Sequence, residues 1–164
     1  KKALYYANMF GQMPHDLKIY TKKMYIHRDL GKDDLSWWTL GLDNPNTEMH
    51  ANHSSCTNKE TTSMYNYDYC VDTMIHELAH NLYNLKKLKK KWKKIRKLDK
   101  KLYCSKYGKQ NANEDFAESI LCWIGVRYKS NEIDKSELVQ INQFIPNRLK
   151  FFDDLNLNMH PWKN

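Results

Sequence analysis

The clearest pattern in the chain is a central run of apolar residues at helical spacing. Between Val71 and Leu85 these residues recur every three or four positions, which predicts an amphipathic helix, and Asp68 or Asp72 is available to cap its start. The same spacing continues through residues 85–102, where lysines fill most of the remaining positions. We expect that segment to form a helix with one apolar seam and a cationic outer face.

The C-terminal third repeats the helical pattern. Residues 114–127 present an apolar face, and Asn113 is of a residue type that caps helix N-termini. Residues 133–152 predict one more helix, interrupted at Pro146, because proline lacks the amide hydrogen that a helix interior needs. The tail, residues 153–164, shows no regular pattern and is expected to be irregular.

The N-terminal part carries shorter elements. Residues 1–13 have helical character, and two runs rich in β-branched or aromatic residues, 23–28 and 36–42, are typical of strands. Residues 43–63 are rich in Asn, Thr, Ser and Asp, which predicts a loop with room for a short strand. Residues 64–69 fit either an edge strand or the start of the central helix. Early strands followed by helices predict an α+β fold.

Length and composition are those of one folded domain. The chain has 164 residues, of which 41% are hydrophobic and 13% aromatic, too many for a disordered chain and enough to form a core. No stretch approaches the roughly 18 apolar residues of a membrane-spanning helix. We expect a single domain over residues 1–164, without a transmembrane segment and as a monomer.

The formal net charge of +8 comes from one segment. Residues 86–101 hold 11 of the 27 Lys and Arg residues and one acid, Asp99, for a net charge of +10, whereas the remaining 16 basic and 18 acidic residues give −2. The segment is either a solvated helix face or a docking site for an anionic surface, such as anionic lipid or glycosaminoglycan. Nucleic acid is not the expected partner, because only Trp92 and Tyr103 interleave the lysines.

The four cysteines are Cys56, Cys70, Cys104 and Cys122, and none forms a CxxC pair. That spacing argues against a zinc ribbon or a thioredoxin-type site. They can form two disulfides in three connectivities, of which neighbour pairing would join Cys56 to Cys70 and Cys104 to Cys122, or they can remain four buried thiols. Disulfides are favoured, and with them a secreted or extracellular location.

The chemistry-bearing motif is His76-Glu77-Leu78-Ala79-His80, an HExxH pattern inside the central helix. Residues four apart lie on the same helix face, so both imidazoles can reach one metal ion. Glu77, beside them, can act as general base towards a water on that metal. The alternative is a chance match in a structural helix, which the central place of the motif in a strongly periodic helix disfavours.

A catalytic zinc needs a third protein ligand and an open position. No histidine lies between His80 and His160, so a carboxylate is the natural candidate. Glu114 and Glu118, in the segment NEDFAES, are four residues apart and share one face of the next helix. One of them can bind zinc while the other orients a ligand histidine through its second ring nitrogen. Without the HExxH motif, both would be read as solvent-facing glutamates.

A tyrosine completes the pattern, because Tyr107 lies seven residues before the sequence Glu114-Asp115-Phe116-Ala117-Glu118. Together with HExxH, this arrangement resembles the catalytic domain of anthrax lethal factor and the related clostridial Pro-Pro endopeptidases, a subgroup of the gluzincin metalloproteases. The resemblance covers about residues 68–128 and rests on all three motifs. It implies one zinc ion per chain, with the ligands His76, His80 and Glu114.

The same resemblance implies roles for three more residues. Glu77 would be the general base, Glu118 would support a ligand histidine, and Tyr107 would donate a hydrogen bond to the tetrahedral oxyanion. Two features depart from the family. The lysine-rich helix stands between the two motifs, and Asp115 replaces a common aromatic residue, so a second carboxylate adjoins the Glu114 position and can compete with it.

These patterns together predict a zinc metalloprotease of zincin-like α+β fold. Residues 1–67 would form an N-terminal helix and strands, residues 68–128 the zinc-site helices, and residues 129–164 a helical C-terminal part. We expect a hydrolase, specifically an endopeptidase acting on protein or peptide substrates. The rival hypothesis is a non-catalytic zinc-containing module that binds a partner protein or an anionic surface through its basic helix.

Overall fold

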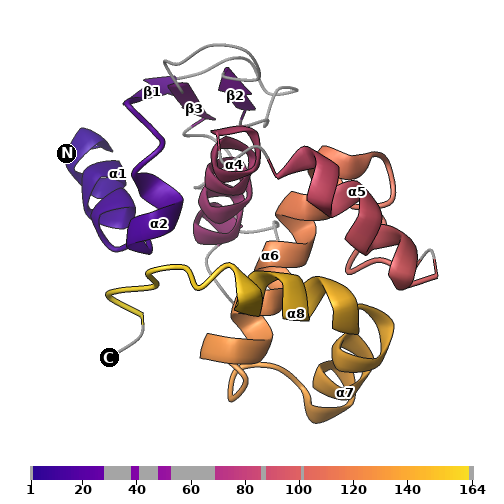
Figure 1. Ribbon diagram of the computed structural model, residues 1–164. Helices are drawn as coiled ribbons and strands as arrows, with labels where there is room; N and C mark the ends of the chain where they lie inside the picture. The colour runs from indigo at the N-terminus through magenta and orange to yellow at the C-terminus, as the bar shows by residue number, and fades with distance from the viewer. Residues whose placement is uncertain are drawn as a thin grey trace.

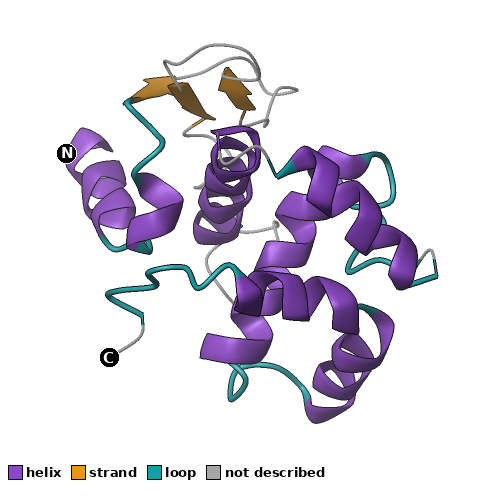
Figure 2. Cartoon of the chain, in the orientation of Figure 1, coloured by secondary structure: helices purple, strands orange, loops and turns teal. Residues whose placement is uncertain are grey.

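The computed structural model of the protein describes residues 2–27, 38–40, 48–52, 69–85, 88–100 and 102–162 (Figure 1). Helices dominate these ranges, and three short strands form one small sheet (Figure 2). The expected combination of a small N-terminal sheet with a mainly helical C-terminal half is therefore confirmed at this level.

The sheet is built from three strands in the order β1-β3-β2. The central strand β3 (Glu48–Asn52) runs parallel to β1 (Lys23–His27), with Ile26 opposite Ala51, and antiparallel to β2 (Trp38–Leu40). β1 and β2 lie inside the two predicted strand segments. β3 lies within residues 43–63, which were predicted to form a loop that can contain a short strand. β2 is an edge strand of this sheet and contacts the central helix α4.

The N-terminal helices are α1 (Lys2–Gly11) and α2 (His15–Lys18). The sequence predicted α1 but not α2, because a four-residue helix is too short to show a period. Pro14 precedes α2 at its N-cap position, where a missing amide hydrogen costs nothing. α2 packs against α4 and brings the N-terminal part to the central helix.

The helices of the C-terminal half are α4 (Tyr69–Leu85), α5 (Lys89–Leu98), α6 (Ala112–Tyr128), α7 (Lys135–Phe144) and α8 (Pro146–Asp154). α5 ends before Leu102, so the predicted apolar seam of the basic helix is shorter than expected. The break between α7 and α8 falls at the predicted proline, which occupies the first turn of α8. Of the segment predicted as an edge strand or helix start, residues 64–68 lie outside the described residues.

One prediction about α6 was wrong, namely its cap. The helix begins at Ala112, and the side chain of Asn111 accepts hydrogen bonds from the backbone N–H groups of Asn113 and Glu114 at 2.9 and 3.1 Å. Asn113 is therefore a residue of the first turn and not the cap. The two asparagines have the same capping propensity, so the sequence alone did not separate them.

The core joins α4, α5, α6 and α8 through aromatic side chains. The ring of Phe116 on α6 contacts Tyr83 on α4 at 4.8 Å, Trp92 on α5 at 5.0 Å and Phe152 on α8 at 5.1 Å between ring centroids. Tyr83 is 1% exposed and the other three rings are fully buried. Because Phe116 is flanked by Glu114 and Glu118, this packing fixes the helix that carries both glutamates.

A disulfide joins Cys104 to Cys122, with their Cα atoms 6.3 Å apart. Cys70 is disulfide-bonded as well, and Cys56 lies outside the described residues. The expectation of disulfides is confirmed, and Cys104 pairs as neighbour pairing predicts. None of the helices in the described ranges has the length and apolar character that a membrane crossing requires.

Candidate metal centre

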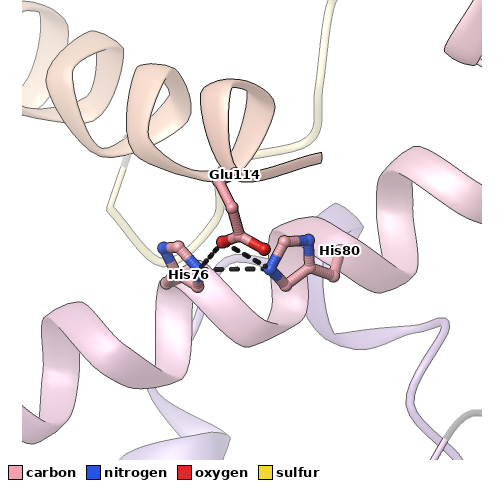
Figure 3. Close-up of side chains that lie close together, drawn as sticks. All are labelled: His76, His80 and Glu114. Atoms are coloured by element: carbon pink, nitrogen blue, oxygen red, sulfur yellow. Dashed lines mark hydrogen bonds and ion pairs between the residues drawn. The ribbon is translucent and has the colours of Figure 1, made fainter. Parts of the chain in front are cut away.

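His76 and His80 lie one turn apart on α4 and face the start of α6 (Figure 3). Their Nε2 atoms are 3.1 Å apart and their rings meet edge to face. Each residue is 9% exposed. The spacing of the HExxH motif thus produces two imidazoles that converge on one small volume between the two helices.

Glu114 completes this group from α6. Its Oε2 atom lies 3.0 Å from Nε2 of His76 and 3.4 Å from Nε2 of His80 (Figure 3). The cap residue Asn111 lies three positions before Glu114, which places Glu114 in the first turn of α6 with its side chain directed at α4 (Figure 3). Zinc–ligand bonds of about 2.0–2.1 Å at tetrahedral angles put neighbouring ligand atoms about 3.3 Å apart. The donor set and its spacing therefore fit a zinc ion.

Glu118 lies on the far side of the His76 ring. The Nδ1–H group of His76 donates to Oε1 of Glu118 over 2.8 Å, and Glu118 is only 6% exposed. This bond fixes the ring orientation and points Nε2 at Glu114 and His80. Both glutamates come from one face of α6, one turn apart, so a single helix supplies a candidate ligand and the support of another ligand.

The charges of the group are strongly coupled. Burial alone would lower the pKa of His76, but hydrogen bonds with Glu114 and Glu118 outweigh burial and raise the pKa to about 9. Burial opposes ionisation of Glu114, yet hydrogen bonds with His76 and His80 hold its pKa well below the usual range. Without a metal, an imidazolium at His76 is thus held between two carboxylates. A metal ion at Nε2 would replace one of its protons.

Glu77 and Tyr107 border this group. Glu77 is 7% exposed, and its charge acts on both His76 and Tyr107, raising the pKa of each. The ring centroid of Tyr107 lies 5.7 Å from that of His76, and the residue is 48% exposed. Partial burial raises the pKa of Tyr107, and Glu114 raises it further, so its hydroxyl remains a hydrogen-bond donor at neutral pH.

The loop that carries Tyr107 is anchored at several points. The disulfide ties Cys104 to α6, and the backbone N–H of Gly108 donates to the hydroxyl of Ser105 at 3.0 Å. A Cβ atom on Gly108 would lie 3.2 Å from Cβ of Glu118 and 3.4 Å from Cα of Asp115. Glycine is therefore what lets this loop lie directly against the helix that carries both glutamates.

Asp115 does not compete for the metal position. It is fully buried and points to the other side of α6, where it pairs with Arg148 at 3.1 Å and with Arg96 at 3.1 Å. Arg148 is itself fully buried and also pairs with Asp99 at 2.7 Å. The sequence analysis did not predict this ion-pair cluster. The one available signal was that Asp99 is the single acidic residue of the basic segment, which suggests that it pairs with a cation.

Comparisons with known proteins do not assign the chain to a family. No family profile matches it, and the searches of curated proteins and of solved structures gave no match. Any functional conclusion therefore depends on the motifs and on the geometry described above.

Proposed function

We propose that the protein is a secreted, zinc-dependent endopeptidase of the gluzincin type with a zincin-like fold. The observation that carries the proposal is the meeting of His76, His80 and Glu114, whose candidate ligand atoms all lie within 4.8 Å of one another. These residues come from α4 and α6, two helices that are far apart in sequence. A chance HExxH match in a structural helix gives no reason for a third ligand, or for Glu118 behind His76.

In this proposal His76, His80 and Glu114 hold the zinc ion. When bound, zinc supplies Lewis acidity, which lowers the pKa of a coordinated water to about 7 and polarises a carbonyl group. Glu77 takes the proton from the attacking water and returns it to the amine nitrogen that leaves, so one carboxylate serves both proton transfers. The Tyr107 hydroxyl donates a hydrogen bond to the carbonyl oxygen as negative charge develops on it.

The sheet suggests how a substrate would bind. β2 is an edge strand and contacts α4, the helix that carries both histidines. An extended peptide that pairs with this edge would add its backbone to the sheet and pass beside the two histidines. Among the described strands, β2 has one edge without a partner, and backbone groups at such an edge can pair with an extended peptide whatever its side chains, so this arrangement supports a protein or peptide substrate.

The test is a cleavage assay on an unbiased peptide library, read by mass spectrometry together with the zinc content of each sample. Wild type should contain about one zinc per chain and cut peptides. Glu77→Gln should retain the zinc and lose cleavage, because it removes the proton acceptor and leaves the three proposed ligands. Glu114→Ala should lose both, and Glu132→Gln, an exposed glutamate on the loop after α6, should change neither.

Three results would contradict the proposal. Cleavage that persists in Glu77→Gln would exclude this residue as the base, and a full zinc content in Glu114→Ala would exclude it as a ligand. Stoichiometric zinc without any cleavage by wild type would favour the rival hypothesis of a non-catalytic zinc-containing module.

A further inference from the structure

The outer face of α5 is a dense and unpaired cationic surface. Six lysines of this helix are exposed: Lys89, Lys90, Lys91, Lys93, Lys94 and Lys97. None of them takes part in an ion pair within the described part of the chain. Lysines three and four positions apart repel one another on a helix, so the isolated protein bears an uncompensated electrostatic cost at this face.

The other side of α5 is fully used by the fold. Trp92 is buried against Phe116, and Arg96 turns inward to pair with Asp115 at 3.1 Å. The only arginine of the helix is thereby held in an ion pair, with 22% of its side chain exposed. Figure 1 shows α5 at the outside of the molecule, and its contacts are with α6 and α8. The lysine face is therefore an outward-facing surface whose chemistry is that of ammonium groups alone.

Two exposed leucines adjoin the lysines. Leu98, the last residue of α5, is 57% exposed, and Leu102, just beyond it, is 40% exposed. Aliphatic side chains beside a cationic helix face match the boundary between headgroups and acyl chains of a bilayer. A single-stranded nucleic acid would instead use exposed aromatic rings for stacking, and a duplex would be held through its phosphates by the lysines alone, without the leucines. Trp92 is fully buried, and Tyr103 lies under the guanidinium groups of Arg96 and Arg148.

We propose that this lysine face, together with Leu98 and Leu102, docks the protein on a bilayer rich in anionic phospholipid. The lysines would lie at the headgroups, and the two leucines would insert at the boundary below them. This inference does not depend on the proposed metal centre, because none of its residues belongs to that group. The interaction is peripheral and reversible, as expected for a cationic face with a small apolar area.

The test is flotation of the protein with vesicles of phosphatidylcholine containing about 30% phosphatidylserine, compared with vesicles of phosphatidylcholine alone. We expect binding to the anionic vesicles only, and loss of binding as salt rises from about 0.1 M to 1 M because the charges are then screened. Each lysine near an anionic surface changes the partition coefficient about fivefold. Lys93→Gln/Lys97→Gln should therefore lower binding at least tenfold.

Matched controls separate this surface from charge and hydrophobicity in general. Lys135→Gln/Lys150→Gln removes the same charge from exposed positions of α7 and α8 and should leave binding nearly unchanged. Leu98→Ser should weaken vesicle binding, whereas Leu4→Ser, at a residue of α1 that is 65% exposed, should not. Glu77→Gln should bind vesicles like wild type, so a failure here is distinct from a failure of the proposed peptidase.

Three results would overturn the proposal. The first is no preference for anionic over neutral vesicles. The second is unchanged vesicle binding in Lys93→Gln/Lys97→Gln. The third concerns Leu98→Ser. If wild type binds heparin or single-stranded RNA as tightly as anionic vesicles, and Leu98→Ser binds all of them like wild type, the surface is a general polyanion site.

Discussion

Glu118 accepts a hydrogen bond of 2.8 Å from Nδ1 of His76, on the side of the ring that faces away from Glu114. A carboxylate in this position fixes which nitrogen of the imidazole carries a proton and leaves Nε2 directed at the candidate metal position. The same α6 face supplies Glu114, so the orientation of one proposed ligand and the position of another depend on a single helix.

The first prediction concerns this bond. Glu118→Ala should lower zinc affinity about 10–100-fold, because the His76 ring is no longer oriented and its basicity falls. Competition with a chelating dye of known zinc affinity measures the change. Glu132→Ala, which removes an exposed glutamate, should retain the wild-type affinity. An unaltered affinity in Glu118→Ala would show that the bond has no part in holding a metal.

The second prediction tests the contact between the Tyr107 loop and α6. Gly108→Ala places a methyl group 3.2 Å from Cβ of Glu118 and 3.4 Å from the backbone of Asp115, which cannot move aside easily. We expect a loss of about 1 kcal/mol in the free energy of unfolding, measured by urea denaturation, together with weaker zinc binding, because Glu118 is displaced.

Gly11→Ala is the matched control, since a Cβ atom there meets nothing within 4 Å. Gly11 lies at the end of α1, where alanine is a better helix former, so this variant should be as stable as wild type or more so. Equal stability and zinc affinity in both alanine variants would mean that the loop does not need glycine to lie against α6.

Local patterns in the sequence were enough to place the two site helices. α4 has clear apolar periodicity, whereas α6 is rich in apolar residues and is buried on all sides from Asp115 to Val126. The four-residue spacings of His76 with His80 and of Glu114 with Glu118 put each pair on one helix face. The meeting of the two faces was an inference from the joint motif, and the structure brings the side chains together. Which glutamate lies beside His80 and which behind His76 depends on how the helices pack.

Other features had no local signal. Arg148 is separated from Asp115 by 33 positions and stands in an ordinary polar helix segment, so nothing nearby in the sequence indicates that it is fully buried. The pairing of Cys104 with Cys122 was one of several connectivities, because four cysteines carry no information about their partners. The start of α6 was missed because Asn111 and Asn113 have the same capping propensity, so local sequence does not separate them.

The third prediction is that the metal-free protein loses stability at alkaline pH. The pKa of His76 is raised to about 9 in the folded protein, against an ordinary value of 6.5. A raised pKa stabilises the fold fully below about pH 6.5, and this contribution disappears as the pH rises through about 9. The loss is at most about 3 kcal/mol and should appear in urea denaturation of chelator-treated protein across that range.

His76→Asn should flatten this part of the stability profile because the titrating group is gone. His15→Asn, which alters a half-exposed histidine of α2, should leave the profile as it is in wild type. A decline of the same size in His76→Asn and in wild type would assign it to another group.

The fourth prediction separates a buried ion pair from an exposed one. Arg148→Met keeps an unbranched side chain but leaves Asp99 and Asp115 buried without this guanidinium, and should cost about 3–5 kcal/mol of stability. Arg127→Met breaks an exposed ion pair, in which the side chains of Arg127 and Asp153 are 37% and 40% exposed. This change should lower the free energy of unfolding by at most about 1 kcal/mol. Thermal and urea denaturation measure both, and similar losses would contradict the assigned role of burial.

The last prediction is that the disulfide serves catalysis through Tyr107. Cys104→Ser/Cys122→Ser should cost about 3 kcal/mol, since the bond closes a loop with a sequence separation of 18. The three proposed ligands lie on α4 and α6, so zinc content should remain about one per chain in conditions where circular dichroism shows the variant folded. Peptide cleavage should nevertheless slow, mainly in kcat, because the loop loses its tie to α6 and Tyr107 is no longer held beside His76.

A double-mutant comparison decides whether this effect passes through the tyrosine. Tyr107→Phe removes only the hydroxyl and should lower kcat about 10²–10³-fold, the usual size for loss of one oxyanion donor. If the disulfide acts by positioning that hydroxyl, removing the disulfide in the Tyr107→Phe background should lower kcat little further, because the hydroxyl that the disulfide positions is already absent. If the two losses multiply instead, the disulfide acts on other parts of the centre, and the loop is not a positioning device for Tyr107.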